Sequence, residues 1–116
     1  MDTTNLDQQV SELGDAAGKA GNGRSARMLY GGPTSTLTQT VIAMREGARL
    51  GDHESPGEAT MLVLRGRLRV ASQGQSWEGA EGDLLELPLE THAVEAVTDA
   101  AFLLTAAKVR GRRAEA

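Results

Sequence analysis

The sequence contains no cysteine, which excludes disulfides, thiolate metal sites and a cysteine nucleophile. Aromatic side chains are almost as scarce, because Tyr30, Trp77 and Phe102 are the only three. The core must therefore be built from aliphatic residues, alanine and methionine. The absence of cysteine also suits the reducing cytoplasm, which is the localisation that we expect.

Long apolar runs and an excess of basic residues are missing too. No apolar run approaches the roughly 20 residues of a membrane-spanning helix, and the beginning, M-D-T-T-N-L-D, does not resemble a secretory signal. The net charge of −4 argues against a nucleic-acid-binding surface. Only the end of the chain is basic, and four charges at a terminus give little affinity at physiological salt. We expect a soluble protein with no nucleic-acid partner and no membrane association.

The first 23 residues have helical periodicity. An apolar stripe predicts an amphipathic helix that starts near residue 3 and ends at the glycines at positions 14 and 18. The stripe consists of Leu6, Val10, Leu13, Ala16 and Ala17. The stretch G-K-A-G-N-G-R that follows is typical of a flexible connector. This segment is either an arm that binds a partner or a second copy, or a partly ordered extension.

From Arg24 onward the apolar period changes from 3.6 to 2. Short runs of alternating or β-branched residues, separated by glycine-containing turns, predict about eight strands of an antiparallel sandwich or barrel. The clearest runs are 37–44, 60–65, 67–72, a strand around Trp77, 84–88, 92–97 and 101–107. Within 67–72 the alternation places Leu68 and Val70 inward and the arginines outward.

The chain has two histidines, His53 and His92, and each follows a glycine and adjoins an apolar strand-like run. Neutral imidazole is the commonest protein metal ligand. Two histidines alone do not make a stable site, so a metal centre needs a third ligand.

The spacing around both histidines resembles the motifs of the cupin superfamily. Gly47 is followed by five residues and His53, and Gly66 closes this first motif. In the second motif Gly82, five residues, Pro88 and then His92 follow in the same order. The likeness covers about residues 35 to 107 and is greatest to small single-domain bacterial cupins. It implies an all-β jelly-roll sandwich, a double-stranded β-helix, here preceded by a short N-terminal α-helix.

The departures from these motifs concern the metal ligands. A full cupin site resembles three histidines and a glutamate around a first-row metal, but this chain has Ser55 and Ala59 at two of those positions. Glu58 stands one step before the expected glutamate. Strand alternation turns it away from His53, although the turn Ser-Pro-Gly could re-aim it inward. In that case His53, Glu58 and His92 would hold one Fe, Mn or Zn ion. Otherwise we expect no cofactor.

These observations predict a helical arm and linker (1–23), a cupin β-barrel domain (24–110) and a flexible basic tail (111–116). A small-molecule ligand would lie inside the β-domain, where Val41 and Leu104 also face inward. The expected ligand pocket consists of His53, Ser55, Met61, Val63, Leu85, Leu87, His92 and Val94. Trp77 is expected at the rim or packed on a sheet, with stacking on a ligand as the alternative, and Glu86 is expected to face solvent.

The resemblance implies a small-molecule-binding cupin with a degenerate or absent metal site, acting as a sensor or regulatory module. The alternative is a metal-dependent enzyme of the dioxygenase or isomerase type with the two-histidine, one-carboxylate site. A third possibility is a regulatory protein that acts through its helical arm. Whether the protein is an enzyme stays open. Cupins commonly pair through edge strands, and an unpaired edge needs cover, so we expect a homodimer.

Overall fold

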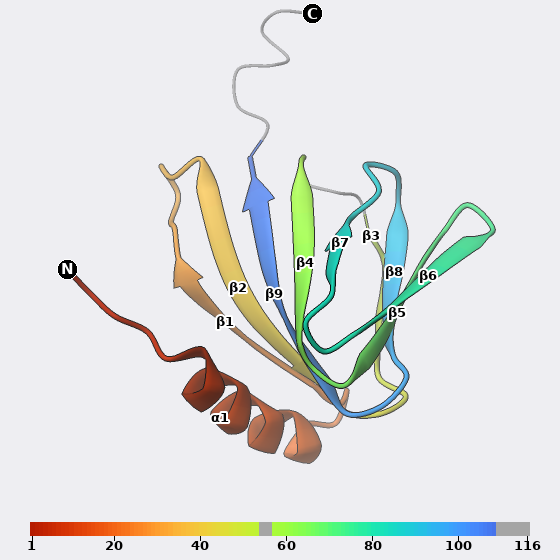
Figure 1. Ribbon diagram of the computed structural model, residues 1–116, viewed down its shortest axis with the longest axis horizontal. Coiled ribbons are helices and arrows are strands. Elements are labelled where there is room, and N and C mark those ends of the chain that lie inside the picture. Colours follow the sequence, from red (N-terminus) through yellow and green to blue (C-terminus); the bar gives the residue numbers. More distant parts are fainter. Residues whose placement is uncertain (54–56, 109–116) are drawn as a thin grey trace, which may run out of the picture.

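The chain folds into two antiparallel β-sheets, with one helix on the outer side of the larger sheet (Figure 1). A computed structural model describes residues 1–53 and 57–108. The elements are, in chain order, α1 (Leu6–Lys19), β1 (Arg24–Tyr30), β2 (Leu37–Met44), β3 (Arg49–His53), β4 (Ala59–Arg65), β5 (Arg67–Ser72), β6 (Gln75–Ala80), β7 (Leu84–Glu86), β8 (His92–Ala96) and β9 (Ala100–Ala107).

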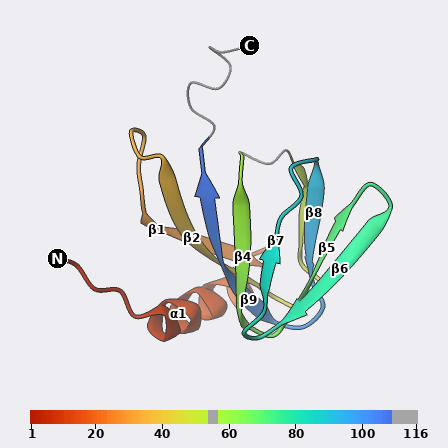
Figure 2. The same ribbon diagram turned by 45° about the horizontal axis from the view of Figure 1, so that its top comes forward.

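The order of the strands is that of a jelly roll. The larger sheet has the order β1-β2-β9-β4-β7 and the smaller one β3-β8-β5-β6. The chain passes to the other sheet after every strand except β1 and β5, which is how a jelly roll differs from two stacked meanders. The two sheets come together at the lower end of Figure 1 and spread apart above it, and Figure 2 shows the same opening from another side. The domain is therefore a sandwich rather than a closed barrel.

The core lies between the sheets and follows the predicted alternation. In β4, Ala59, Met61 and Val63 are buried, and in β5 the same holds for Leu68 and Val70. The core cluster is aliphatic apart from the single phenylalanine. It consists of Met44, Met61, Val63, Leu68, Val70, Val94, Ala96, Ala100 and Phe102. The predicted all-β sandwich with its inward-facing apolar residues is confirmed, while β1 and β3 are strands that the sequence did not mark clearly.

The helix differs from the prediction at both ends. It begins after Asn5, whose side chain accepts a hydrogen bond from the Gln8 amide at 2.8 Å, and it continues through both glycines to Lys19. The helix therefore does not end at Gly14, and it ends one residue after Gly18. A glycine inside a helix costs about 1 kcal/mol relative to alanine, and burial of the apolar face offsets that cost.

That face packs on the chain's own larger sheet. Val10, Leu13 and Ala17 are buried, in one cluster with Val41 and Ala43 of β2. Val41 thus lies under the helix, and the prediction that it lines the interior is wrong. Both faces of β2 are apolar because the core covers one and α1 covers the other. Whether this segment also contacts a partner stays a prediction.

Within the described part of the chain, no helix has the length and hydropathy needed to cross a membrane.

Candidate functional site

The fold brings the two histidines opposite each other on neighbouring strands. β3 and β8 pair antiparallel, and His53 is the register partner of His92. The register shifts between Leu50 and His53, so that a β-bulge places His53 rather than Asp52 at this position. Directly opposed residues of antiparallel strands have Cα atoms about 5 Å apart. Residues far apart in sequence thus meet at one point of the smaller sheet.

His92 is buried on the inner face of this sheet. Its side chain is 2% exposed, and its Nδ1 lies 3.0 Å from the carbonyl oxygen of Glu90. A carbonyl oxygen only accepts, so Nδ1 carries the hydrogen and donates it. Beside it, the Ser72 hydroxyl donates to the Thr91 carbonyl oxygen at 2.8 Å. The Ser72 bond ties the residue before β8 to the end of β5, and the His92 bond braces the loop before β8.

A cavity of about 430 Å³ opens next to this point, between the β5–β6 hairpin and β7 with its following loop. Its volume lies in the usual range for small-ligand sites. The cavity is lined by Val70, Ser72, Gln73, Gln75, Trp77, Leu85, Glu86, Pro88 and Glu90. Of the predicted pocket residues whose side chains the structure describes, only Leu85 is among them.

Trp77 reaches the cavity because of the turn that joins β5 to β6. Gln73 and Gly74 both have positive φ, at 51° and 79°, which is the signature of a two-residue type I′ hairpin turn. This turn sets the register in which Trp77 opposes Val70. Cross-strand partners share a face, so Trp77 faces inward like the buried Val70. Its side chain is nevertheless 43% exposed, because no core residue covers it.

Because Gly79 has no side chain, Leu85 of β7 can pack closely against β6. A Cβ at Gly79 would lie 2.5 Å from Leu85 Cδ1 and 3.4 Å from Val63 Cγ2. Leu85 therefore occupies space that any other residue at position 79 would take. The side chain of Leu85 forms the apolar floor of the cavity together with Val70.

The comparisons with known proteins agree with this topology. The sequence matches no protein-family model and no curated protein. A conserved protein of unknown function from Streptococcus pyogenes is 26% identical, with a TM-score of 0.73 over 92% of this chain and 87% of that chain. A cupin-2 domain protein from Shewanella frigidimarina is 14% identical, with a TM-score of 0.69 over 91% and 95% of the two chains. The chain has the cupin fold.

A third similar structure belongs to a longer protein. It is a transcriptional regulator of the HTH_3 family from Vibrio cholerae, 22% identical, with a TM-score of 0.64 over 75% of this chain and 52% of that chain. The cupin resemblance noted in the sequence is thus confirmed at the level of the fold. The glycines of the two cupin-like motifs, Gly47, Gly66 and Gly82, all have positive φ, which explains why the motif positions require glycine.

A cupin metal centre is not assembled by the described residues. Among them, no three histidine, aspartate or glutamate side chains come together. Glu58 is exposed, and it borders shallow depressions with Thr60, Thr105 and Leu84, all on the outer face of the larger sheet. Ser55 and the His53 side chain lie outside the described part of the structure. The described groups do not fit a three-ligand site, and metal binding stays a prediction.

Apart from Leu85 and Val41, the apolar residues predicted to line the interior lie in or against the packed core of the domain. Met61, Val63 and Val94 are buried to within 2% of completely. Leu87 and Leu104 are partly buried against the same cluster. A ligand in the cavity therefore contacts side chains that lie nearer the surface than these core residues. Glu86 is exposed, as predicted, and stands at the rim of the cavity.

Sequence reasoning placed Trp77 correctly at a rim but did not single out its neighbours. The signal was the two-residue turn Gln73-Gly74, which fixes the register and therefore the face of Trp77. The residues contributed by the loop after β7, Pro88 and Glu90, had no such local signal.

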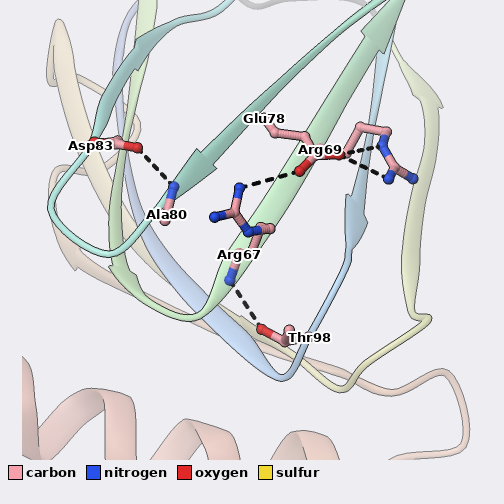
Figure 3. Close-up of polar contacts among 6 residues, drawn as sticks. All are labelled: Arg67, Arg69, Glu78, Ala80, Asp83 and Thr98. Atoms are coloured by element: carbon pink, nitrogen blue, oxygen red, sulfur yellow. Dashed lines mark hydrogen bonds and ion pairs between the residues drawn. The ribbon is translucent and has the colours of Figure 1, made fainter.

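The outer face of the same hairpin carries ion pairs (Figure 3). Arg69 contacts Glu78 at 2.9 Å, and Arg67 contacts Glu78 at 3.3 Å. Arg69 also contacts Glu95 at 2.9 Å. A hydrogen bond from Arg69 and then one from Arg67 hold the pKa of Glu78 below its usual value. Hydrogen bonding to Glu78 in turn raises the pKa of Arg69. These contacts link β6, β5 and β8 behind the cavity.

Proposed function

We propose that this cupin binds a small organic molecule in the cavity beside Trp77 and acts as a binding or sensing module. The observation that carries the proposal is an inward-facing tryptophan that no core residue covers, above a floor of Val70 and Leu85. Ligand sites are typically apolar concavities with a few placed polar groups. The partial match to a transcriptional regulator supports the sensing role.

A ligand-observed NMR screen with a mixture of neutral, cationic and anionic fragments tests this proposal. At least one fragment should bind to the wild-type protein. The Trp77→Ala variant should lose that binding, because the cavity loses one wall. Leu84→Ala is the matched control, since Leu84 is 64% exposed and lies outside the cavity lining. Thermal melts show whether each variant is folded, and a screen without any bound fragment would refute the proposal.

The second candidate is a metal-dependent cupin enzyme of the dioxygenase or isomerase type that uses His53 and His92. Its predicted third ligand, Glu58, is exposed on the outer face of the larger sheet and would have to turn inward to join them. The register pairing of the histidines favours this candidate, and so does the Nδ1 bond of His92, since metal-ligating histidines usually donate from their other ring nitrogen. In the same set of experiments, elemental analysis of the purified protein separates the two candidates. About one Fe, Mn or Zn ion per chain, lost in His53→Ala, would establish the metal centre.

Two further features belong to the proposal. We place the protein in the cytoplasm because it lacks cysteine. We also propose a homodimer through β1, which is an edge strand of the larger sheet and carries the exposed side chains Met28 and Tyr30. An edge strand with exposed apolar groups favours pairing with a second copy.

A further inference from the structure

The cavity lining contains two acids and, among the described residues, no basic side chain. Glu90 lies in the loop after β7. Glu86 stands at the rim, and because it pairs with Thr60 on the outer face of the larger sheet, its side chain points away from the floor formed by Leu85. The remaining polar groups of the lining are the neutral side chains Ser72, Gln73 and Gln75. The electrostatic character of the cavity is therefore negative.

These acids differ from the other acids of the surrounding strands. Glu78 and Glu95, on the outer face, are both paired with Arg69. The carboxylates of Glu86 and Glu90 form no hydrogen bond or ion pair with a described residue. A bound cation would thus gain their attraction without breaking an existing pair.

Trp77 also favours a positively charged ligand. The face of an indole ring is electron-rich and attracts cations more strongly than any other aromatic side chain. Because Trp77 is 43% exposed and faces inward, its ring is accessible from the cavity. The apolar floor of Val70 and Leu85 would bury hydrocarbon next to it.

We infer that the cavity takes a small organic cation, an amine that carries a flat apolar group. The apolar group lies against Trp77 and the floor, and the ammonium lies toward the Glu90 loop, with Glu86 at the rim of the cavity. This inference rests on the proposed function and names the ligand class of the same site.

Three probes of nearly equal shape test the sign of the charge: phenethylammonium, 2-phenylethanol and 3-phenylpropanoate. Trp77 is the only tryptophan, so its fluorescence reports on the cavity directly. The ammonium compound should bind about fivefold more tightly than the alcohol, a typical gain for a partly exposed cation–π contact with nearby carboxylates. The carboxylate should bind most weakly. The preference should shrink in roughly 0.5 M salt, where the Debye length is only a few ångströms.

Variants show which residues cause the tighter binding of the ammonium compound. In Glu86→Gln/Glu90→Gln the ammonium compound and the alcohol should bind equally, with the alcohol's affinity unchanged. Glu81→Gln is the control, because Glu81 is exposed but does not line the cavity, and it should keep the full preference. The single variants Glu86→Gln and Glu90→Gln show how much each acid contributes to the preference for the ammonium compound.

Two results would overturn the inference. If the alcohol binds wild type as tightly as the amine, the cavity binds small molecules without selecting cations, and the proposed function stands. If none of the three probes binds, the inference fails, and the fragment screen decides separately on the proposed function.

Discussion

At the scale of single residues, Gly79 determines how much room the cavity has. Leu85 fills the position that a side chain at residue 79 would take, and it is also the floor of the cavity. A glycine in a strand often marks such a close approach of another element. The width of the cavity thus depends on the absence of a Cβ atom at residue 79.

We predict that Gly79→Ala displaces Leu85 toward the cavity. Overpacking of this kind costs about 1–3 kcal/mol of unfolding free energy, measurable by urea denaturation, and it should weaken fragment binding as well. Gly18→Ala is the control, because its Cβ would meet nothing within 4 Å on the exposed side of α1. That change should instead stabilise the protein by up to about 1 kcal/mol. Equal stability of Gly79→Ala and wild type would contradict the close contact.

At the scale of elements, the β5–β6 hairpin has two faces with different tasks. Its inner face presents Trp77 to the cavity, and its outer face carries the pairs of Arg69 with Glu78 and Glu95. The register places Arg69 directly opposite both acids. Opposite charges in such positions stabilise the strand pairing. The outer face therefore helps to hold the wall that carries Trp77.

We predict that the pairing of Glu78 becomes weaker in acid. Since the pKa of Glu78 is lowered in the folded protein, its contribution to stability is complete above the ordinary pKa of glutamate. It is lost as the pH falls through the lowered value. The melting temperature of Glu78→Gln should accordingly lie below that of wild type at pH 7, and the difference should shrink as the pH falls below the ordinary pKa of glutamate. Glu81→Gln, without such a pair, should show no difference at neutral or acid pH; a constant gap for Glu78→Gln would argue against an electrostatic origin.

At the scale of the whole molecule, the sandwich leaves β1 and β7 as the edges of the larger sheet. β7 has three residues, whereas β1 has seven and exposes Met28 and Tyr30 by more than half. Short edge strands are protected from pairing, but long apolar ones are not. β1 is therefore the edge at which we place the second copy of the chain.

We predict that Met28→Lys weakens the dimer. A two-fold interface would bring two copies of the new charge close together, and the dissociation constant should rise by about tenfold or more. Sedimentation equilibrium over a range of concentrations measures this change. Leu84→Lys, on the opposite edge strand, should leave the dimer unchanged. A wild-type protein that is monomeric at every concentration would rule out the proposed pairing.

Much of the fold could be predicted from local pattern. Alternation in 60–65 and 67–72 identified two strands and their buried faces, because a side chain's face depends only on the parity of its position. The resemblance of the spacing around Gly47, Gly66 and Gly82 to cupin motifs implied the jelly roll, and all three glycines have positive φ in the structure. β3 was less visible, because a bulge interrupts its alternation before His53.

The candidate site was harder to predict because its parts come from different sheets. By itself the sequence determined most of the strands other than β1 and β3, the histidine pair as a point of interest and the inward face of β5. Only the tertiary structure decided that Val41 lies beneath α1 and that Met61 and Val63 are sealed in the core. It also decided that the cavity lies nearer the surface than this core, beside Trp77 and Leu85. The reason is physical: periodicity reports which face of an element is apolar, but only the packing of the other elements determines what covers that face.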